Sequence, residues 1–188
     1  SPAQRYQHRH DGRRIPKDLR WWKVQLALDT FRFSFDPKPP TEVDCFCDGS
    51  TSYGAGLHIA GRERAFPLHS HLRGRVDIKT VEALSLELAV LYLVHLGHHD
   101  TGLLIHSDST AVCDSFKKGR MASDEPNAIL ERVSELEQQN RISIKLRWVK
   151  SEENKADRPS RGKHNSSYGR LPPIPVPAIL LQWFTDSW

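Results

Sequence analysis

The chain lacks the features that mark secreted, membrane-spanning or disulfide-stapled proteins. It has three cysteines, one methionine and no apolar run near the roughly twenty residues that a membrane span needs. Its first twenty residues are basic and polar, without the hydrophobic core of a signal peptide. An odd number of cysteines in a chain of this length indicates a reducing compartment, so we expect an intracellular protein, cytoplasmic or nuclear, with no membrane partner. The close pair Cys45 and Cys47 invites a zinc interpretation, but no second close pair accompanies it.

An excess of acidic residues is also absent. The 27 Lys and Arg residues exceed the 23 Asp and Glu residues, which gives a formal net charge of +4 and favours a polyanionic partner such as nucleic acid. With 188 residues, 38% of them hydrophobic, the chain suits one packed domain with extensions. We expect a basic arm and connecting helix at 1–40, the folded domain at 41–163 and a Pro-rich tail at 164–188. Because the chain begins with Ser-Pro and not Met, we expect a piece processed from a longer protein.

Hydrophobic periodicity predicts an α/β fold. We expect strands at 42–48, 54–60, 63–68, 102–107 and 142–149, and helices at 17–30, 78–96, 110–118 and 127–139, with a short helix from Ala156. Asp77 can cap the helix at 78–96, and two apolar stripes indicate that this helix is buried on two sides. The order predicts a five-stranded mixed sheet, in which three antiparallel meander strands join two parallel strands and helices cover both faces.

Acidic residues recur at the carboxyl ends of the predicted strands. Asp48 ends the first strand, Asp108 ends the fourth and Asp157 follows the fifth, while a glutamate, Glu82 or Glu87, lies on the crossover helix. Active sites of such sheets lie at this edge, so these carboxylates can meet. Clustered carboxylates repel one another unless divalent cations neutralise them, and oxygen ligands alone favour Mg²⁺ or Mn²⁺.

The motifs around these acids carry a family resemblance. They are Asp48-Gly-Ser with Gly54-Ala-Gly56, a helix with Glu-Leu-Ala, Ser107-Asp-Ser109, and Trp148-Val-x-Ser-x-x-Asn154-x-Ala-Asp157-x-x-Ser-Arg161. In this order they resemble the ribonuclease H domain of retrotransposon reverse transcriptases, of the DIRS-like and gypsy-like kind. In those elements a segment like Leu19-Arg-Trp-Trp22 joins the polymerase to the ribonuclease H domain. The likeness spans roughly residues 17 to 163.

The resemblance implies hydrolysis of the RNA strand of an RNA–DNA hybrid with two metal ions, Mg²⁺ or Mn²⁺. Asp48 would bridge both ions, the glutamate and Asp108 would bind the first, and Asp157 would bind the second. Polar and basic side chains would contact the nucleic acid, and the candidates are Ser50, Ser109, Lys117, Lys118, Arg120, Lys150, Lys155, Arg158 and Arg161. Many ribonucleases H carry a histidine before the last acid, and Lys150-Ser-Glu-Glu-Asn154 has none.

The sequence leaves the choice of glutamate open. Small residues at Ser85 and Ala89 would let the helix approach the sheet beside Glu82, whereas the spacing of Glu87 from Asp108 suits cellular ribonuclease H better. The two lie about 140° apart around a helix, so only one can face the metals. We favour Glu82 and keep Glu87 as the alternative.

Other interpretations compete with this one. Asp before Gly or Ser is common turn chemistry, and His98-His99-Asp100 is interpreted as a solvated loop. The fold could also serve as a catalytically silent nucleic-acid or protein platform, or as a transposase or resolvase that cuts duplex DNA. Residues 17–30 and 172–188 could bind a reverse transcriptase domain or another protein, because both contain apolar side chains that would form an interaction site if exposed.

Overall fold

The chain divides into two units, Ser1–Asp36 and Pro37–Trp188. The computed structural model describes residues 19–20, 23–24, 26–27, 39–121 and 123–185. In the first unit, residues 19–20, 23–24 and 26 are helical, and Leu19, Val24 and Leu26 are largely exposed. Most of the expected basic arm, together with Trp21 and Trp22, lies outside the described residues.

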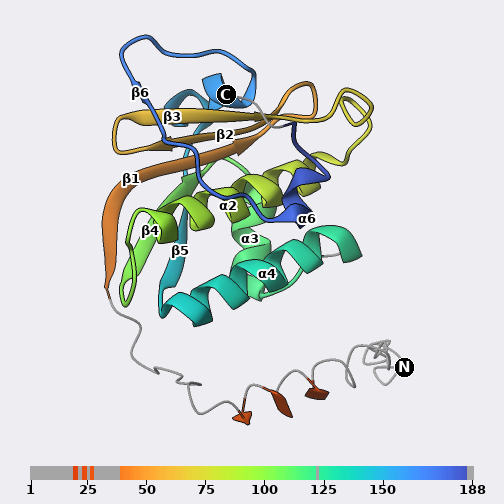
Figure 1. Ribbon diagram of the computed structural model, residues 1–188, viewed down its shortest axis with the longest axis vertical. Helices are drawn as coiled ribbons and strands as arrows, with labels where there is room; N and C mark the ends of the chain where they lie inside the picture. Colours follow the sequence, from red (N-terminus) through yellow and green to blue (C-terminus); the bar gives the residue numbers. More distant parts are fainter. Residues whose placement is uncertain (1–18, 21–22, 25, 28–38, 122, 186–188) are drawn as a thin grey trace, which may run out of the picture. The chain divides into compact units, whose positions relative to one another are not determined.

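A six-stranded mixed sheet forms the centre of the second unit (Figure 1). Its strands are β1 (Pro40–Gly49), β2 (Gly54–Ile59), β3 (Arg62–Pro67), β4 (Gly102–Ser107), β5 (Ser143–Trp148) and β6 (Gly169–Arg170), in the order β5-β4-β1-β2-β3-β6. β1, β2 and β3 pair antiparallel, while β4 pairs parallel with β1 and β5 pairs parallel with β4. The expected meander and parallel pair are therefore confirmed. The sixth strand, which pairs parallel with β3, was not predicted because two residues carry no periodicity.

The helices are α2 (Ile78–His95), α3 (Thr110–Lys118), α4 (Asp124–Asn140), η2 (Ser151–Glu153), α5 (Asp157–Ser160) and α6 (Ala178–Leu181). Asp77 caps α2 as expected, accepting a 2.9 Å hydrogen bond from the backbone N–H of Lys79. α4 begins earlier than predicted because Pro126 is accommodated in its first turn. No helix in the described part of the chain is long and apolar enough to span a lipid bilayer.

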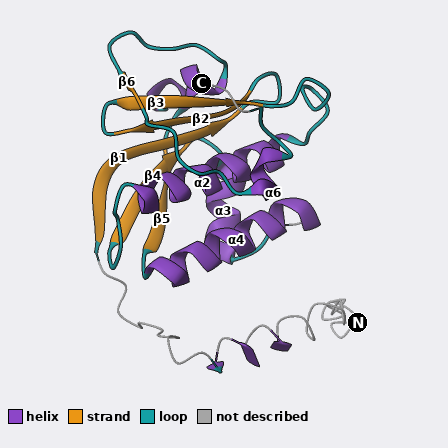
Figure 2. Cartoon of the chain, viewed as in Figure 1, coloured by secondary structure: helices purple, strands orange, loops and turns teal. Residues whose placement is uncertain are grey.

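Helices cover both faces of the sheet, and two glycines allow their close approach. A Cβ atom at Gly49 would lie 2.6 Å from the backbone N of Glu82 in α2, and one at Gly56 would lie 2.2 Å from the backbone N of Ser160 in α5. Gly56 pairs with Asp48, and side chains alternate along a strand, so Gly49 and Gly56 face opposite sides. α2 therefore lies on one face and α5 on the other, and Figure 2 shows α2 and α4 stacked on the same side of the sheet.

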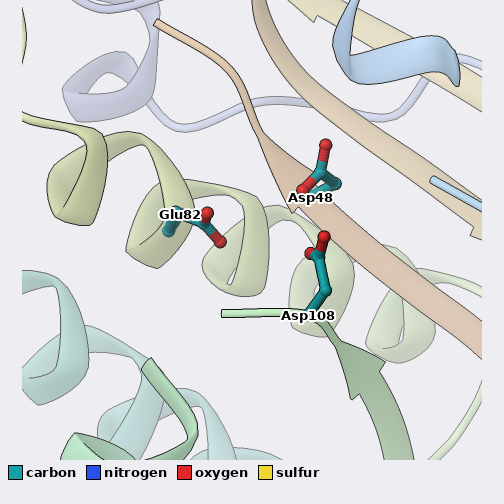
Figure 3. Close-up of side chains that lie close together, drawn as sticks. All are labelled: Asp48, Glu82 and Asp108. Carbon is teal, nitrogen blue, oxygen red and sulfur yellow. The ribbon is translucent and has the colours of Figure 1, made fainter. Parts of the chain in front are cut away.

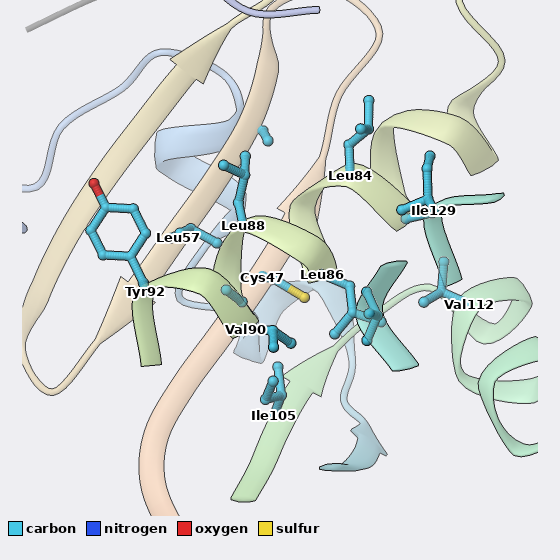
Figure 4. Packing of buried hydrophobic residues seen from close by; sticks show 14 of the residues in the cluster. Cys47, Leu57, Leu84, Leu86, Leu88, Val90, Tyr92, Ile105, Val112 and Ile129 are labelled. Atoms are coloured by element: carbon cyan, nitrogen blue, oxygen red, sulfur yellow. The ribbon is translucent and has the colours of Figure 1, made fainter. Parts of the chain in front are cut away.

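The core lies mainly between the sheet, α2 and α4 (Figure 4). α2 buries twelve residues around nearly its whole circumference, because the sheet covers one side and α4 another. Leu84, Leu88, Leu57 and Ile105 are among the fully buried side chains. The two apolar stripes on this helix thus have the partners that the sequence predicted.

The Pro-rich C-terminal segment packs onto the domain. Leu171, Leu180 and Phe184 are at most 3% exposed and belong to the same core cluster. Phe184 forms a β-bridge with Leu68, and the hydroxyl of Tyr92 in α2 donates a 3.1 Å hydrogen bond to the carbonyl of Pro172. The segment up to Thr185 is thus part of the folded unit and not a detached tether.

Candidate metal centre

Three carboxylates meet at the carboxyl ends of the central strands. Asp48, Glu82 and Asp108 each offer an oxygen atom, and these atoms lie within 4.8 Å of one another. Figure 3 shows Asp48 at the end of β1, Glu82 on α2 and Asp108 just beyond β4, with their carboxylates turned toward one another. Among the described residues this is the group with metal-ligand spacing, and its all-oxygen donor set suits a hard divalent cation.

The backbone around Gly49 brings Glu82 to this point. Gly49 follows Asp48 directly, and without a Cβ it admits the backbone of Val81 and Glu82 to the strand. Ser85, fully buried on the next turn, donates a 2.7 Å hydrogen bond to the carbonyl of Glu82, so its small polar side chain is satisfied within the helix. The sequence indicated the small residues on the helix and the Asp48-Gly-Ser motif, but it gave Gly49 no role in admitting the helix.

Glu87 lies elsewhere. Its side chain is 3% exposed and forms two hydrogen bonds, of 2.7 and 2.6 Å, with the guanidinium of Arg132 in α4. This bidentate ion pair joins α2 to α4 in the interior. Of the two glutamates that the sequence left open, the structure brings Glu82 to the other acids.

The fourth acid, Asp157, is the first residue of α5. It does not belong to the group of three, yet it is close enough for its charge to contribute to the raised pKa of Asp48. One oxygen of Asp157 accepts a 2.9 Å hydrogen bond from Nε of Arg161 and lies 2.8 Å from Nη2 of the same side chain, so the carboxylate is partly neutralised by Arg161. Asp157 thus lies beside the three acids, but its carboxylate pairs with Arg161.

Residues around Asp157 hold the other acids in place. Asn154 donates to Asp108 at 2.8 Å and to the carbonyl of Cys47 at 3.2 Å, and Ser151 donates to the second oxygen of Asp108 at 2.5 Å. Ser160 donates to Asp48. The sequence singled out Asn154 and Ser160 as motif letters without giving them a role. Their role is to orient carboxylates.

The electrostatics of the cluster favour a bound cation. Burial, followed by the charges of Asp108 and Asp157, raises the pKa of Asp48 to about 7, against the lowering effect of the Ser160 hydrogen bond. Burial, followed by the charges of Asp48 and Asp108, raises the pKa of Glu82 to about 8. One oxygen of Glu82 is buried and has no hydrogen-bond partner among the described residues. A divalent ion would supply both the missing partner and the missing positive charge.

The predicted nucleic-acid contacts fall into two groups. Lys155 pairs with Asp44 and Arg161 pairs with Asp157, whereas the other basic candidates are exposed: Lys117, Lys118, Arg120, Lys150 and Arg158. Ser109 caps α3 by accepting a 3.3 Å hydrogen bond from the backbone N–H of Val112. Ser50 is buried, and its hydroxyl lies 2.9 Å from that of Ser52.

Comparison with known proteins identifies the fold. No family model and no curated protein sequence matches the chain. Among solved structures, it is similar to RNase H1 from the halophilic archaeon Halobacterium salinarum NRC-1, with a TM-score of 0.50 and 18% identity over 62% of this chain and 91% of that one. It is also similar to the N-terminal RNase H domain of rv2228c from Mycobacterium tuberculosis, solved as a fusion with maltose-binding protein, with a TM-score of 0.51 and 18% identity over 66% and 98% of the two chains. The fold is therefore ribonuclease H-like.

Proposed function

We propose that this chain, with its ribonuclease H-like fold, is a metal-dependent endonuclease that hydrolyses the RNA strand of RNA–DNA hybrids. The observation that carries the proposal is the convergence of Asp48, Glu82 and Asp108 within 4.8 Å at the strand ends of that fold. The two similar structures are both RNase H domains, which supports the same substrate class.

The residues present fit Mg²⁺ or Mn²⁺. Asp48, Glu82 and Asp108 would hold one ion, and Asp48 with Asp157 a second. Two such ions, when bound, supply an activated water molecule and stabilise the leaving oxygen of the phosphodiester. The chain's own contribution is orientation, because Asn154 and Ser151 fix both oxygens of Asp108 and Ser160 fixes one oxygen of Asp48.

The exposed basic residues would position the nucleic acid. α3 begins at Thr110, two residues after Asp108, so Lys117 lies roughly 10 Å along the helix axis from that end, where it could reach a neighbouring phosphate. Lys118 and Arg120 follow it, while Lys150 directly precedes Ser151, which binds Asp108, and Arg158 directly follows Asp157. These contacts would give affinity for the backbone of the hybrid, with the 2′-hydroxyls marking the RNA strand.

We also propose a retroelement reverse transcriptase as the origin of the domain. The support is the closing motif, since Asn154, Asp157, Ser160 and Arg161 of Asn-x-Ala-Asp-x-x-Ser-Arg all take part in the hydrogen bonds around the acids.

Cleavage assays test the function. A labelled RNA–DNA hybrid, duplex DNA and duplex RNA would each be incubated with the protein in Mg²⁺ or Mn²⁺, alongside Asp108→Asn. A matched control is Asp100→Asn. Asp100 is an exposed aspartate that pairs with Arg141, and it lies just before β4, whereas Asp108 lies just after it. We expect ion-dependent cutting of the hybrid RNA by the wild type and by Asp100→Asn, and a loss of more than roughly 100-fold in Asp108→Asn.

Other outcomes point to the rival functions. Tight binding of the hybrid without cleavage of any substrate would support a silent binding platform. Cleavage of duplex DNA in preference to the hybrid would support a transposase or resolvase of the same fold.

A further inference from the structure

β1 is irregular at Asp44, four residues before Asp48 of the acidic cluster. Its pairing with β4 shifts register between Glu42 and Cys45, and Asp44 has a φ of +48°, in the left-handed region that few residues other than glycine adopt. A bulge of this kind re-aims a side chain. Here it turns Asp44 toward His58, which pairs with Phe46 on the face of the sheet that carries α5.

The carboxylate of Asp44 makes two contacts on this face. One oxygen lies 2.5 Å from Nζ of Lys155, and the other lies 3.2 Å from Nε2 of His58. His58 is fully buried, and burial lowers its pKa, so the imidazole is neutral near neutral pH. A carboxylate only accepts hydrogen bonds, so Nε2 of His58 donates one without bringing a charge. The charge of Asp44 is therefore matched by Lys155.

Lys155 has a second contact that limits its movement. Its Nζ lies 5.1 Å from the ring centroid of Phe46, and that ring stacks on His106 at 4.6 Å. The ammonium group is thus held between an aromatic face and a carboxylate. Its side chain is 37% exposed, so part of it remains in contact with solvent.

Lys155 lies in the chain between two residues of the acidic site, Asn154 and Asp157. The residue before it, Asn154, binds Asp108 and the carbonyl of Cys47, and its own side-chain oxygen accepts from the backbone N–H of Ala156 at 3.1 Å. Asp157 follows, and its backbone N–H donates to the carbonyl of Asn154 at 3.0 Å. Lys155 therefore lies between Asn154, which binds Asp108, and Asp157, the fourth acid, in one hydrogen-bonded turn.

We propose that Asp44 is a positioning residue, which anchors Lys155 to the sheet and so holds Asn154 against Asp108 and Asp157 beside Asp48. This inference rests on the proposed nuclease function for its kinetic test, but not for its structural one. It assigns Lys155 to the organisation of the site in place of a direct contact with nucleic acid.

The experiment compares Asp44→Asn, Lys155→Met, the double variant and Lys155→Arg. Asparagine tolerates the left-handed conformation, so Asp44→Asn removes the charge without straining the backbone. The matched control is Asp100→Asn, because Asp100 also has a positive φ, of +54°, and a 2.6 Å ion pair, with Arg141. For each protein we would measure kcat and KM on the hybrid in Mg²⁺, and amide hydrogen exchange of residues 154–157 in the absence of metal.

We expect Asp44→Asn and Lys155→Met each to lower kcat roughly 10-fold with KM nearly unchanged, since misplacing a site costs turnover more than binding. The double variant should be no worse than the poorer single variant, because the two residues act as one unit. Lys155→Arg should recover most of the activity, since it restores the ion pair. Exchange at Ala156 and Asp157 should be faster in both single variants and unchanged in Asp100→Asn.

Two results would overturn the proposal. One is a rise in KM for Lys155→Met that Asp44→Asn does not share, which would make Lys155 a substrate contact. The other is unchanged hydrogen exchange in Asp44→Asn. If the wild type cuts no substrate, the nuclease proposal fails, and the exchange measurement still decides the role of Asp44.

Discussion

The side-chain hydroxyl of Ser160 donates a hydrogen bond to the carboxylate of Asp48, and the two residues are 112 positions apart in the chain. The same hydroxyl lies 2.8 Å from the carbonyl of Asp157. Gly56 makes the approach possible, because a Cβ atom there would lie 2.2 Å from the backbone N of Ser160. Asp48 is thus oriented by α5, the helix that begins with the fourth acid, Asp157.

Replacing Ser160 with alanine should therefore weaken the site without removing an acid. The hydrogen bond lowers the pKa of Asp48, so its loss should raise that pKa further and move the acid limb of the pH–rate profile to higher pH. We expect metal affinity or activity to fall about 10- to 100-fold, as for other residues that orient ligands. Mg²⁺ titration and a pH–rate profile check this, with exposed Ser166→Ala as the control. An unshifted profile would contradict the role given to Ser160.

The two glutamates of α2 should respond in opposite ways to substitution by glutamine. Glu82→Gln should abolish ion-dependent cleavage and leave the fold intact. Glu87→Gln should keep the site but break the bidentate pair with Arg132, which costs on the order of 2 kcal/mol of unfolding free energy because the pair is largely buried. Urea denaturation and cleavage assays on both variants measure the contrast. The opposite pattern, with activity lost in the Glu87 variant alone, would show that the ligand is misassigned.

Stability without metal should fall as the pH rises. The pKa values of Asp48 and Glu82 are raised to about 7 and about 8 in the folded protein, so their protonated forms favour folding. This contribution is present below the ordinary carboxyl pKa and is lost as the pH rises through 7 and 8. In EDTA, the wild type should lose stability relative to Glu82→Gln between pH 5 and 9, as followed by thermal denaturation.

Added Mg²⁺ or Mn²⁺ should reverse that loss at the alkaline end. An ion present at 100 times its dissociation constant stabilises the folded state by about 2.7 kcal/mol. Glu82→Gln should show a smaller gain, since it lacks one ligand. Equal gains in the two proteins would mean that the cation binds elsewhere.

Neighbouring leucines of α6 offer a matched pair for the C-terminal segment. Leu180 is fully buried in the core, whereas Leu181 is 40% exposed. Leu180→Ala should cost about 2–5 kcal/mol of unfolding free energy, and Leu181→Ala about 0.5 kcal/mol or less. Equal small effects in equilibrium denaturation would mean that the segment does not stabilise the domain.

The sequence predicted those features that local periodicity encodes. The bounds of β4 and α3 agree with the prediction to the residue. A short apolar run marks β4, and Ser109 and Gly119 lie directly before and after α3. The convergence of strand ends followed from topology rules, which brought Asp48 and Asp108 to one edge.

Features that depend on distant partners escaped prediction. Nothing near Asp44 indicates that its carboxylate meets Lys155, 111 positions away. The prolines of residues 172–177 suggested a tether, because only the tertiary structure shows that Pro172 binds Tyr92 and that Phe184 pairs with Leu68. Arg132 likewise gives no local sign that it neutralises Glu87.

The buried C-terminal anchors also determine when the site can exist during synthesis of the chain. Asp48, Glu82 and Asp108 leave the ribosome first, but the donors that orient two of them, Asn154 and Ser160, emerge much later. Leu180 and Phe184, which complete the core, come later still. A nascent chain stalled before Asn154 would carry three of the four acids without these donors, and one stalled before Leu180 would carry all four acids but lack part of the core that supports them.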